Sequence, residues 1–195
     1  FLNAEQRERI SRRLEVWISA QLNDSLGGLM SLRQASLNGV ARGLAYRVIE
    51  GLGSLSRQLV LREVRDLTKE ARNALRICGI RIGTESLFIP SLLKPKAIQW
   101  RSRLWALHNG KSVPPPPAPG LVTVLVTDDT PHGYLEACGF CLLGGRAIRV
   151  DVLDRLATDL RRQSRAGKIK IGAAQLNLLG LSMKDAHPIF EALGY

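Results

Sequence analysis

Residues 75–107, LRICGIRIGTESLFIPSLLKPKAIQWRSRLWAL, decide how the chain is organised, because no single secondary-structure period fits all of them. A helix is expected to end at Cys78, with Gly79 just beyond its C-terminus. The alternation in IRIG predicts a short strand, and an apolar run interrupted by proline follows it. Pro95 suits the first position of a new helix, which is predicted to end at Asn109-Gly110.

Upstream of this stretch, apolar residues recur at helical spacing. Three amphipathic helices are predicted, over residues 3–22, 38–53 and 56–78, and a short helix over 29–36 lies between the first two. This part of the chain therefore has the pattern of a helical bundle.

Downstream of it, residues 112–120, SVPPPPAPG, form the clearest boundary in the chain. Such a run favours an extended polyproline helix that acts as a stiff spacer. Beyond it the pattern predicts a strand over 121–126, a short helix, and then a hairpin that turns at Gly144-Gly145. A helix over 151–164, capped by Asp151, and a short strand near residue 170 are expected next.

The last residues outline a helix-turn-helix, in which Ser182 caps the final helix. The predicted fold class is mainly α (α+β): an N-terminal helical bundle followed by a small α/β domain that is winged-helix-like or contains the helix-turn-helix. The predicted domains are residues 1–111, a linker over 112–120, and residues 121–195.

The charge of the chain points to a polyanionic partner. The net charge is +11, and Lys and Arg outnumber Asp and Glu by 19 to 9 in residues 1–111 but only by 9 to 8 in residues 112–195. A strongly basic surface attracts nucleic acid.

Two groups of cations are the candidate nucleic-acid contacts, and each contains a run with no intervening acid. The first basic group consists of Lys94, Lys96, Arg101, Arg103 and Lys111. The second basic group consists of Arg146, Arg149, Arg161, Arg162, Lys168 and Lys170. We expect the outer face of the helix after Pro95 to carry Lys96, Arg101 and Arg103.

Two tryptophans lie in the helix that follows Pro95. Trp100 and Trp105 are five residues apart, which sets them roughly 140° apart around a helix. One is expected in the core. The other is expected to pack beneath Arg101 or Arg103, or to stack on a base.

Motifs for catalysis and cofactors are few. The sequence has no phosphate-binding G-x-x-x-x-G-K-[ST] loop and no G-x-S-x-G motif, so no ATP site, catalytic residue or cofactor is assigned to it. Cys138 and Cys141 have the spacing of a zinc or redox pair, but no second paired motif accompanies them, and two half-buried structural thiols are the better interpretation. No apolar run approaches the roughly 18 residues of a membrane helix, and a cytoplasmic location with no membrane partner is expected.

The phrases ALRICGIRIG (74–83), IPSLLKP (89–95) and LWAL (104–107) resemble, in wording and order, the region downstream of the helicase core in alphaproteobacterial superfamily-two helicases related to the RNA helicase of the mitochondrial degradosome. The resemblance extends over about residues 28–195. It implies a non-catalytic accessory region that packs on the motor domains of an ATP-dependent helicase and guides a single-stranded or partly duplex RNA or DNA strand. ATP and Mg²⁺ would be bound by those upstream domains. The helicase motifs are absent and the chain begins at Phe1, which favours a C-terminal fragment over a complete enzyme.

Two other hypotheses stay open. The first is a free-standing DNA-binding regulator that uses residues 172–193 as a helix-turn-helix, although Pro188 and two acids weaken its recognition helix. The second is a protein-interaction scaffold or an unrecognised enzyme, in which the basic groups meet acidic protein surfaces.

Overall fold

A computed structural model describes residues 2–167 and 169–195, and Lys168 of the second basic group lies outside the described residues. The α-helices are α1 (Ala4–Gln34), α2 (Gly39–Glu50), α3 (Leu61–Asp66), α4 (Lys69–Ile77), α5 (Pro95–His108), α6 (Tyr134–Ala137), α7 (Val150–Arg165), α8 (Ala173–Leu179) and α9 (Met183–Ala192). The strands are β1 (Ser54–Ser56), β2 (Arg81–Ile82), β3 (Ser86–Phe88), β4 (Thr123–Leu125), β5 (Phe140–Leu143) and β6 (Arg146–Arg149), and two short 3₁₀ helices are η1 (Arg57–Val60) and η2 (Pro90–Leu93). The chain is mainly α with two small antiparallel sheets, which confirms the predicted α+β class.

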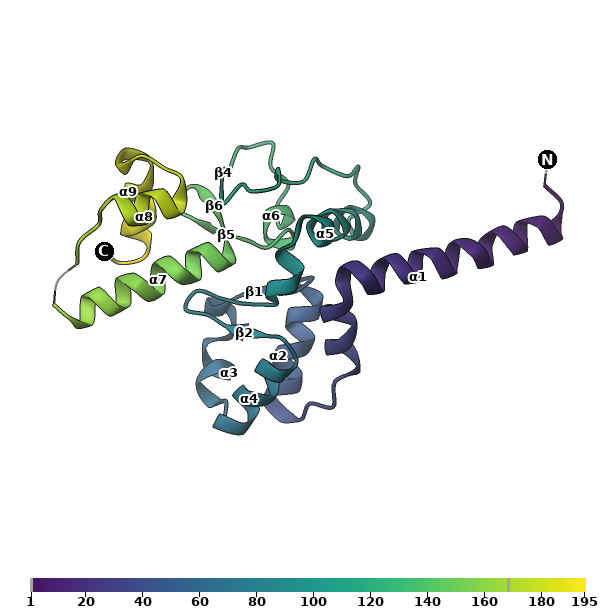
Figure 1. Ribbon diagram of the computed structural model, residues 1–195, viewed down its shortest axis with the longest axis horizontal. Helices are drawn as coiled ribbons and strands as arrows, with labels where there is room; N and C mark the ends of the chain where they lie inside the picture. The colour runs from purple at the N-terminus through teal and green to yellow at the C-terminus, as the bar shows by residue number, and fades with distance from the viewer. Residues whose placement is uncertain (1, 168) are drawn as a thin grey trace.

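Helix α1 joins the two helices predicted over 3–22 and 29–36 into one, with a kink at Leu26 (φ −118°, ψ 23°). Asn3 and Gln6 form a reciprocal capping box at its start. The buried hydrophobic residues form separate cores, which we number in chain order. From the kink onward, Leu26, Leu29 and Leu32 are buried in the first core. Before it, residues 4–20 are exposed at every position, and this half projects from the body of the molecule (Figure 1).

The helix predicted over 56–78 is wrong, because β1, η1, α3 and α4 share this stretch. The backbone becomes extended at Leu67, and the side chain of Thr68 accepts a hydrogen bond from the Ala71 amide and starts α4. The break lets Val64, Leu67 and Leu75 all enter the first core. Strand β3 pairs with β1 and β2 on either side, and Leu55 lies opposite Leu87.

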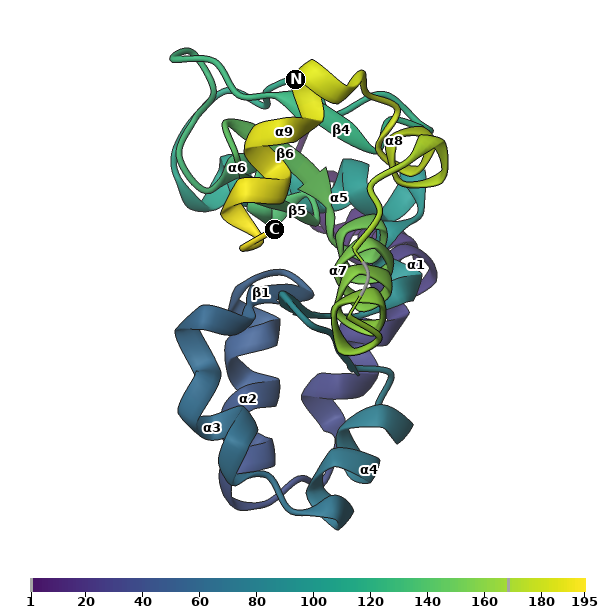
Figure 2. The same cartoon turned by 90° about the vertical axis from the view of Figure 1, so that its left-hand side faces the viewer.

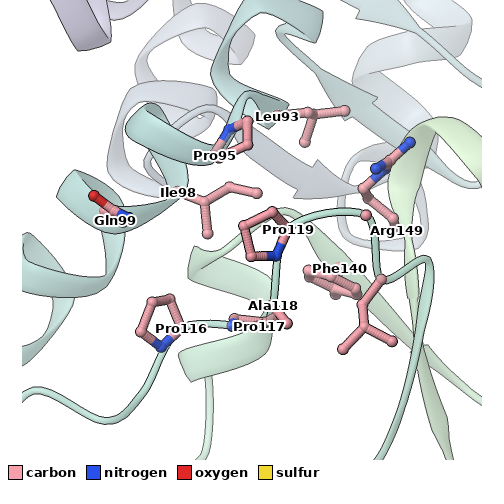
Figure 3. Close-up of a pocket in the computed structure, with 12 residues that line it drawn as sticks. Leu93, Pro95, Ile98, Gln99, Pro116, Pro117, Ala118, Pro119, Phe140 and Arg149 are labelled. Atoms are coloured by element: carbon pink, nitrogen blue, oxygen red, sulfur yellow. The ribbon is translucent and has the colours of Figure 1, made fainter.

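Helix α5 starts at Pro95 as predicted and lies between two cores. Ala97 belongs to the first core, while Ile98, Trp105 and Ala106 belong to the second core with Tyr134, Leu135 and Phe140. The proline-rich segment 112–120 is attached to this region, because the Pro114 carbonyl accepts hydrogen bonds from Ser102 and Tyr134. Its prolines then lie against the start of α5 and Phe140 around a small pocket (Figure 3).

The C-terminal part combines the β4-β6-β5 sheet with α7, α8 and α9 around a third core. Helix α7 begins at Val150, so Asp151 lies inside its first turn and pairs with Arg149; the predicted Asp151 cap is wrong. Residues 169–171 form no strand, contrary to the expectation near residue 170. The predicted Ser182 cap of α9 is confirmed, since its side chain accepts from the Asp185 amide.

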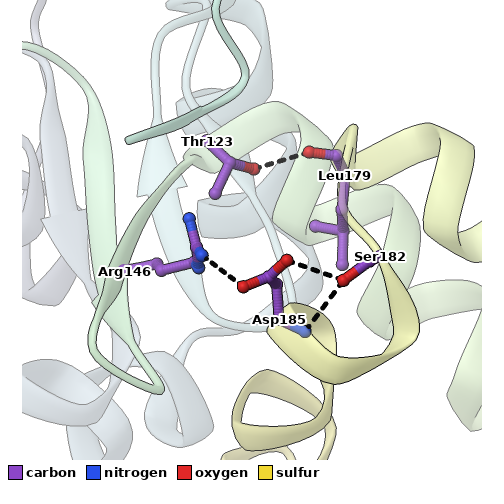
Figure 4. Close-up of polar contacts among 5 residues, drawn as sticks. All are labelled: Thr123, Arg146, Leu179, Ser182 and Asp185. Atoms are coloured by element: carbon purple, nitrogen blue, oxygen red, sulfur yellow. Dashed lines mark hydrogen bonds and ion pairs between the residues drawn. The ribbon is translucent and has the colours of Figure 1, made fainter. Parts of the chain in front are cut away.

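Helices α8 and α9 form the predicted helix-turn-helix outline, joined at Gly180 in the left-handed conformation (φ 66°). Two contacts hold this unit to the sheet (Figure 4). Thr123 Oγ1 donates to the Leu179 carbonyl at 2.8 Å, and Arg146 pairs with Asp185 at 2.9 Å. None of the helices in the described ranges has the length and apolarity that crossing a bilayer requires.

Candidate nucleic-acid interface

Arg101, a member of the first basic group, is fully buried, so the expectation that it lies on the outer face of α5 is wrong. Its Nη2 donates to Ser54 Oγ at 2.6 Å and its Nη1 to the Leu92 carbonyl at 3.2 Å. Burial lowers the pKa of Arg101 to about 10. The side chain joins α5 to the first sheet and cannot reach a phosphate.

The spacing of α5 could have predicted this burial. Ile98, Arg101, Ser102 and Trp105 follow the i, i+3, i+4, i+7 pattern of one helix face, and all four are buried. The charge of Arg101 favours a surface position, but its place in the helical period is that of a core residue.

The other members of the first basic group are exposed. Lys96 pairs with Asp24, and this hydrogen bond lowers the pKa of the Asp24 carboxyl. Among the described residues, Lys94, Arg103 and Lys111 have no carboxylate partner. The guanidinium of Arg103 lies 5.2 Å from the centroid of Trp100, while Trp105 is the buried tryptophan, as expected for one of the two.

The second basic group is largely neutralised by acids from other parts of the chain. The pairs are Arg146–Asp185, Arg149–Asp151, Arg161–Glu85 and Arg162–Asp159. Glu85 lies between β2 and β3, far from Arg161 in sequence. Cations that have no acidic neighbour in the sequence can therefore still have an acidic partner in the fold. Lys170 is exposed and has no carboxylate partner within the described ranges.

A further basic surface, which the sequence analysis missed, lies over α4 and β2. Two adjoining hollows of about 470 Å³ and 560 Å³ share Arg72 and Arg76 in their linings. We call the combined surface the arginine hollow; its cations are Lys69, Arg72, Arg76 and Arg81. The remaining lining residues are Glu70, Asn73, Gly79, Ile80, Ile82 and Pro90.

Hydrogen bonds hold the arginines of this hollow in place. Arg72 donates to the carbonyls of Val64 and Leu67, which lie at the break between α3 and α4. Arg76 donates to Asn73 Oδ1 at 2.9 Å. Arg81 pairs with the buried Asp154 of α7 at 3.1 Å, yet its side chain stays 61% exposed. Cations fixed in this way lose little side-chain entropy when an anion binds.

The signal for the hollow was present in the sequence. Lys69, Arg72, Asn73 and Arg76 occupy i, i+3, i+4 and i+7 of one helix, so they lie on one face. The short strand β2 then adds Arg81 beside them. The long helix predicted over 56–78 gave no reason to expect Arg81 beside them.

The two weak metal candidates lie in or next to β5. Cys138 is fully buried and Cys141 is half-buried, and burial raises the pKa of each thiol to about 11. Protonated thiols are poor metal ligands. Within residues 2–167 and 169–195, no group of three or more His, Cys, Asp or Glu side chains is arranged to hold a metal ion.

The chain matches no protein-family model, no curated protein and no solved structure. The resemblance to helicases therefore stays a prediction.

Proposed function

We propose that the chain is a non-catalytic, nucleic-acid-binding accessory region that holds and guides a strand for an ATP-dependent RNA or DNA helicase. The observation that carries this proposal is the arginine hollow, where four cations meet two acids, Glu70 and the Asp154 that pairs with Arg81. Anchored arginines at a concave surface are suited to phosphate groups, which accept two parallel hydrogen bonds from one guanidinium.

The proposed role is sequence-independent. Contacts to phosphate position a strand and carry no base information, which is what a guide for a moving strand needs. Lys94, which directly follows η2, and Arg103 of α5 are further exposed cations outside the hollow. The Arg103–Trp100 pair adds a cation and an aromatic surface on which a base can stack.

In this proposal ATP and Mg²⁺ belong to motor domains of a parent protein, and no residue of this chain is catalytic. A cytoplasmic location is proposed with it, which suits the three free cysteines.

The helix-turn-helix regulator is less well supported. Asp185 lies in the first turn of α9, the end that enters a DNA groove in such proteins, and its carboxylate is bonded to Arg146 and Ser182 (Figure 4). A carboxylate at that position repels phosphate, and Pro188 inside the helix lacks a backbone N–H donor.

The test is a binding titration with fluorescent single-stranded RNA and DNA of unrelated sequences over a range of salt concentrations. We expect binding to all of them, with a log–log salt slope of about −2 to −3, since three or four phosphate contacts each contribute about −0.7. Absence of binding at low salt would rule out the strand-holding role. A strong preference for one duplex sequence would favour the regulator instead.

A further inference from the structure

The projecting half of α1 carries an apolar stripe that nothing in its own molecule covers. Ile10, Leu14, Trp17 and Ile18 follow the i, i+4, i+7, i+8 pattern, and their exposed fractions lie between 41% and 55%. Such spacing is that of a helix that lays one face into a groove.

The rest of α1 keeps this half away from its own body. Leu26, Leu29 and Leu32 anchor the helix in the first core, and residues 4–20 extend outward from there (Figure 1). Any surface that covers the stripe therefore comes from another molecule or another part of a larger assembly.

An apolar groove that could receive such a stripe lies where α2, α5 and α6 converge. Its volume is about 660 Å³, within the usual range for binding clefts. Most of its lining is apolar: Ile49, Leu52, Leu104, Trp105, Leu107 and Ala137. Leu107 lines the groove and is 79% exposed. A large apolar side chain is therefore open to solvent at the edge of the groove.

The groove is acidic in a protein that is strongly basic. Glu50 and Glu136 line it, and neither has a cationic partner among the described residues. The apolar stripe of α1 has basic neighbours: by helical spacing Arg7 and Arg13 lie beside it, and no carboxylate pairs with them in the described part of the chain, whereas Glu8 pairs with Arg12 on the far face. The two surfaces are complementary in both polarity and charge.

Backbone strain at the groove gives an independent reason to regard it as a site. Leu52 has φ 53°, and it is the one non-glycine residue with a positive φ in residues 2–167 and 169–195. It follows the end of α2 at a position where glycine is usual, because a side chain strains the left-handed conformation. This conformation directs Leu52 into the second core and the groove lining, and strain of this kind gathers at binding sites.

We propose that the chain associates with a second copy of itself, and that residues 7–18 of one copy occupy the groove formed by α2, α5 and α6 of the other. The apolar stripe covers the groove floor, and the flanking arginines meet Glu50 and Glu136. The contact is heterologous, so two copies either exchange helices reciprocally or join head to tail. This association does not depend on nucleic-acid binding.

The test measures the mass of the nuclease-treated chain by sedimentation equilibrium up to about 1 mM, the limit for the weakest specific contacts. Leu14→Glu removes the stripe and Leu107→Glu removes the groove rim, and both residues are exposed, so both variants should fold. Each variant alone should be monomeric where the wild type associates. Ser19→Glu, on the opposite face of α1, and Ile77→Glu, 76% exposed on α4, should associate like the wild type.

A mixing experiment distinguishes this arrangement from any other self-association. The Leu14→Glu chain keeps an intact groove and the Leu107→Glu chain keeps an intact helix, so an equimolar mixture should form a 1:1 complex although neither forms one alone. A wild type that stays monomeric at every concentration would overturn the proposal. So would association that survives in both variants.

Discussion

Nη2 of Arg101 donates a hydrogen bond to Oγ of Ser54 at 2.6 Å, and Ser54 Oγ donates in turn to the Glu136 carbonyl at 3.0 Å. These two bonds join α5, β1 and α6 in the interior. A fully buried guanidinium without a carboxylate is costly. Two of its nitrogens donate to the Leu92 carbonyl and the Ser54 hydroxyl, while its Nε has no partner in the described part of the chain.

Replacing Arg101 should therefore affect stability and not strand binding directly. Arg101→Ala leaves a cavity and an unpaired Leu92 carbonyl, and we expect a loss of about 3 kcal/mol in the free energy of unfolding. Arg103→Ala, on the exposed face of the same helix, should cost less than about 1 kcal/mol. Urea unfolding of both variants makes the comparison, and equal losses would contradict the buried role.

The stability of the protein should fall in alkaline solution because of its buried thiols. Burial raises the pKa of Cys138 from its ordinary value of 9.0 to about 11. Between these two values the unfolded chain has released a proton that the folded chain still holds, so its contribution to stability is complete below pH 9 and is lost as the pH rises through about 11.

The Cys138→Ala variant separates this contribution from the others. Arg101 acts in the opposite direction above about pH 10, since burial lowers its pKa, and it is present in both proteins. Measured by urea unfolding from pH 9 to pH 11, the stability of Cys138→Ala should decline less than that of the wild type. Parallel declines would mean that the thiol does not titrate with unfolding.

Replacement by alanine should change the stability of the fold in opposite directions at two glycines, one inside α2 and one at its end. Gly43 is exposed inside α2 and an added Cβ would meet nothing within 4 Å, so Gly43→Ala should stabilise the fold by about 1 kcal/mol. An added Cβ at Gly51 would lie 2.1 Å from the Ser54 carbonyl oxygen, so Gly51→Ala should destabilise it by about 1–3 kcal/mol. Thermal unfolding of the two variants tests both signs at once.

Local signals in the sequence predicted the elements that local chemistry controls. Pro95 begins α5, Ser182 caps α9, and the Gly144-Gly145 turn joins β5 to β6. Each depends on a backbone preference or a cap that acts within a few residues. The fold class follows from such elements, so it could be predicted.

The predictions were wrong where contacts between distant parts of the chain determine the structure. The stretch 56–78 has helical periodicity throughout, yet packing of β1 against β3 and the break at Leu67 divide it. Arg161 finds Glu85 across the fold, which no local pattern reveals. The candidate site shifted for the same reason: Arg81 joins Arg72 and Arg76 only because β2 turns back beside α4.

The central claim is that the arginine hollow binds the phosphates of a strand. Arg76 tests it best, because its side chain is exposed and, among the described residues, bonds to Asn73 alone, whereas Arg72 holds two backbone carbonyls. Lys184 is the matched control: it is exposed, and the helix that carries it, α9, lies at the opposite end of the molecule from α4 (Figure 2).

The deciding measurement is the affinity of Arg76→Glu and Lys184→Glu for single-stranded RNA across the salt series. We predict that Arg76→Glu binds about tenfold more weakly at low salt, for every strand sequence, with a log–log salt slope smaller by about 1 in magnitude, and that Lys184→Glu binds like the wild type. Equal affinities and slopes for Arg76→Glu and the wild type would contradict the account.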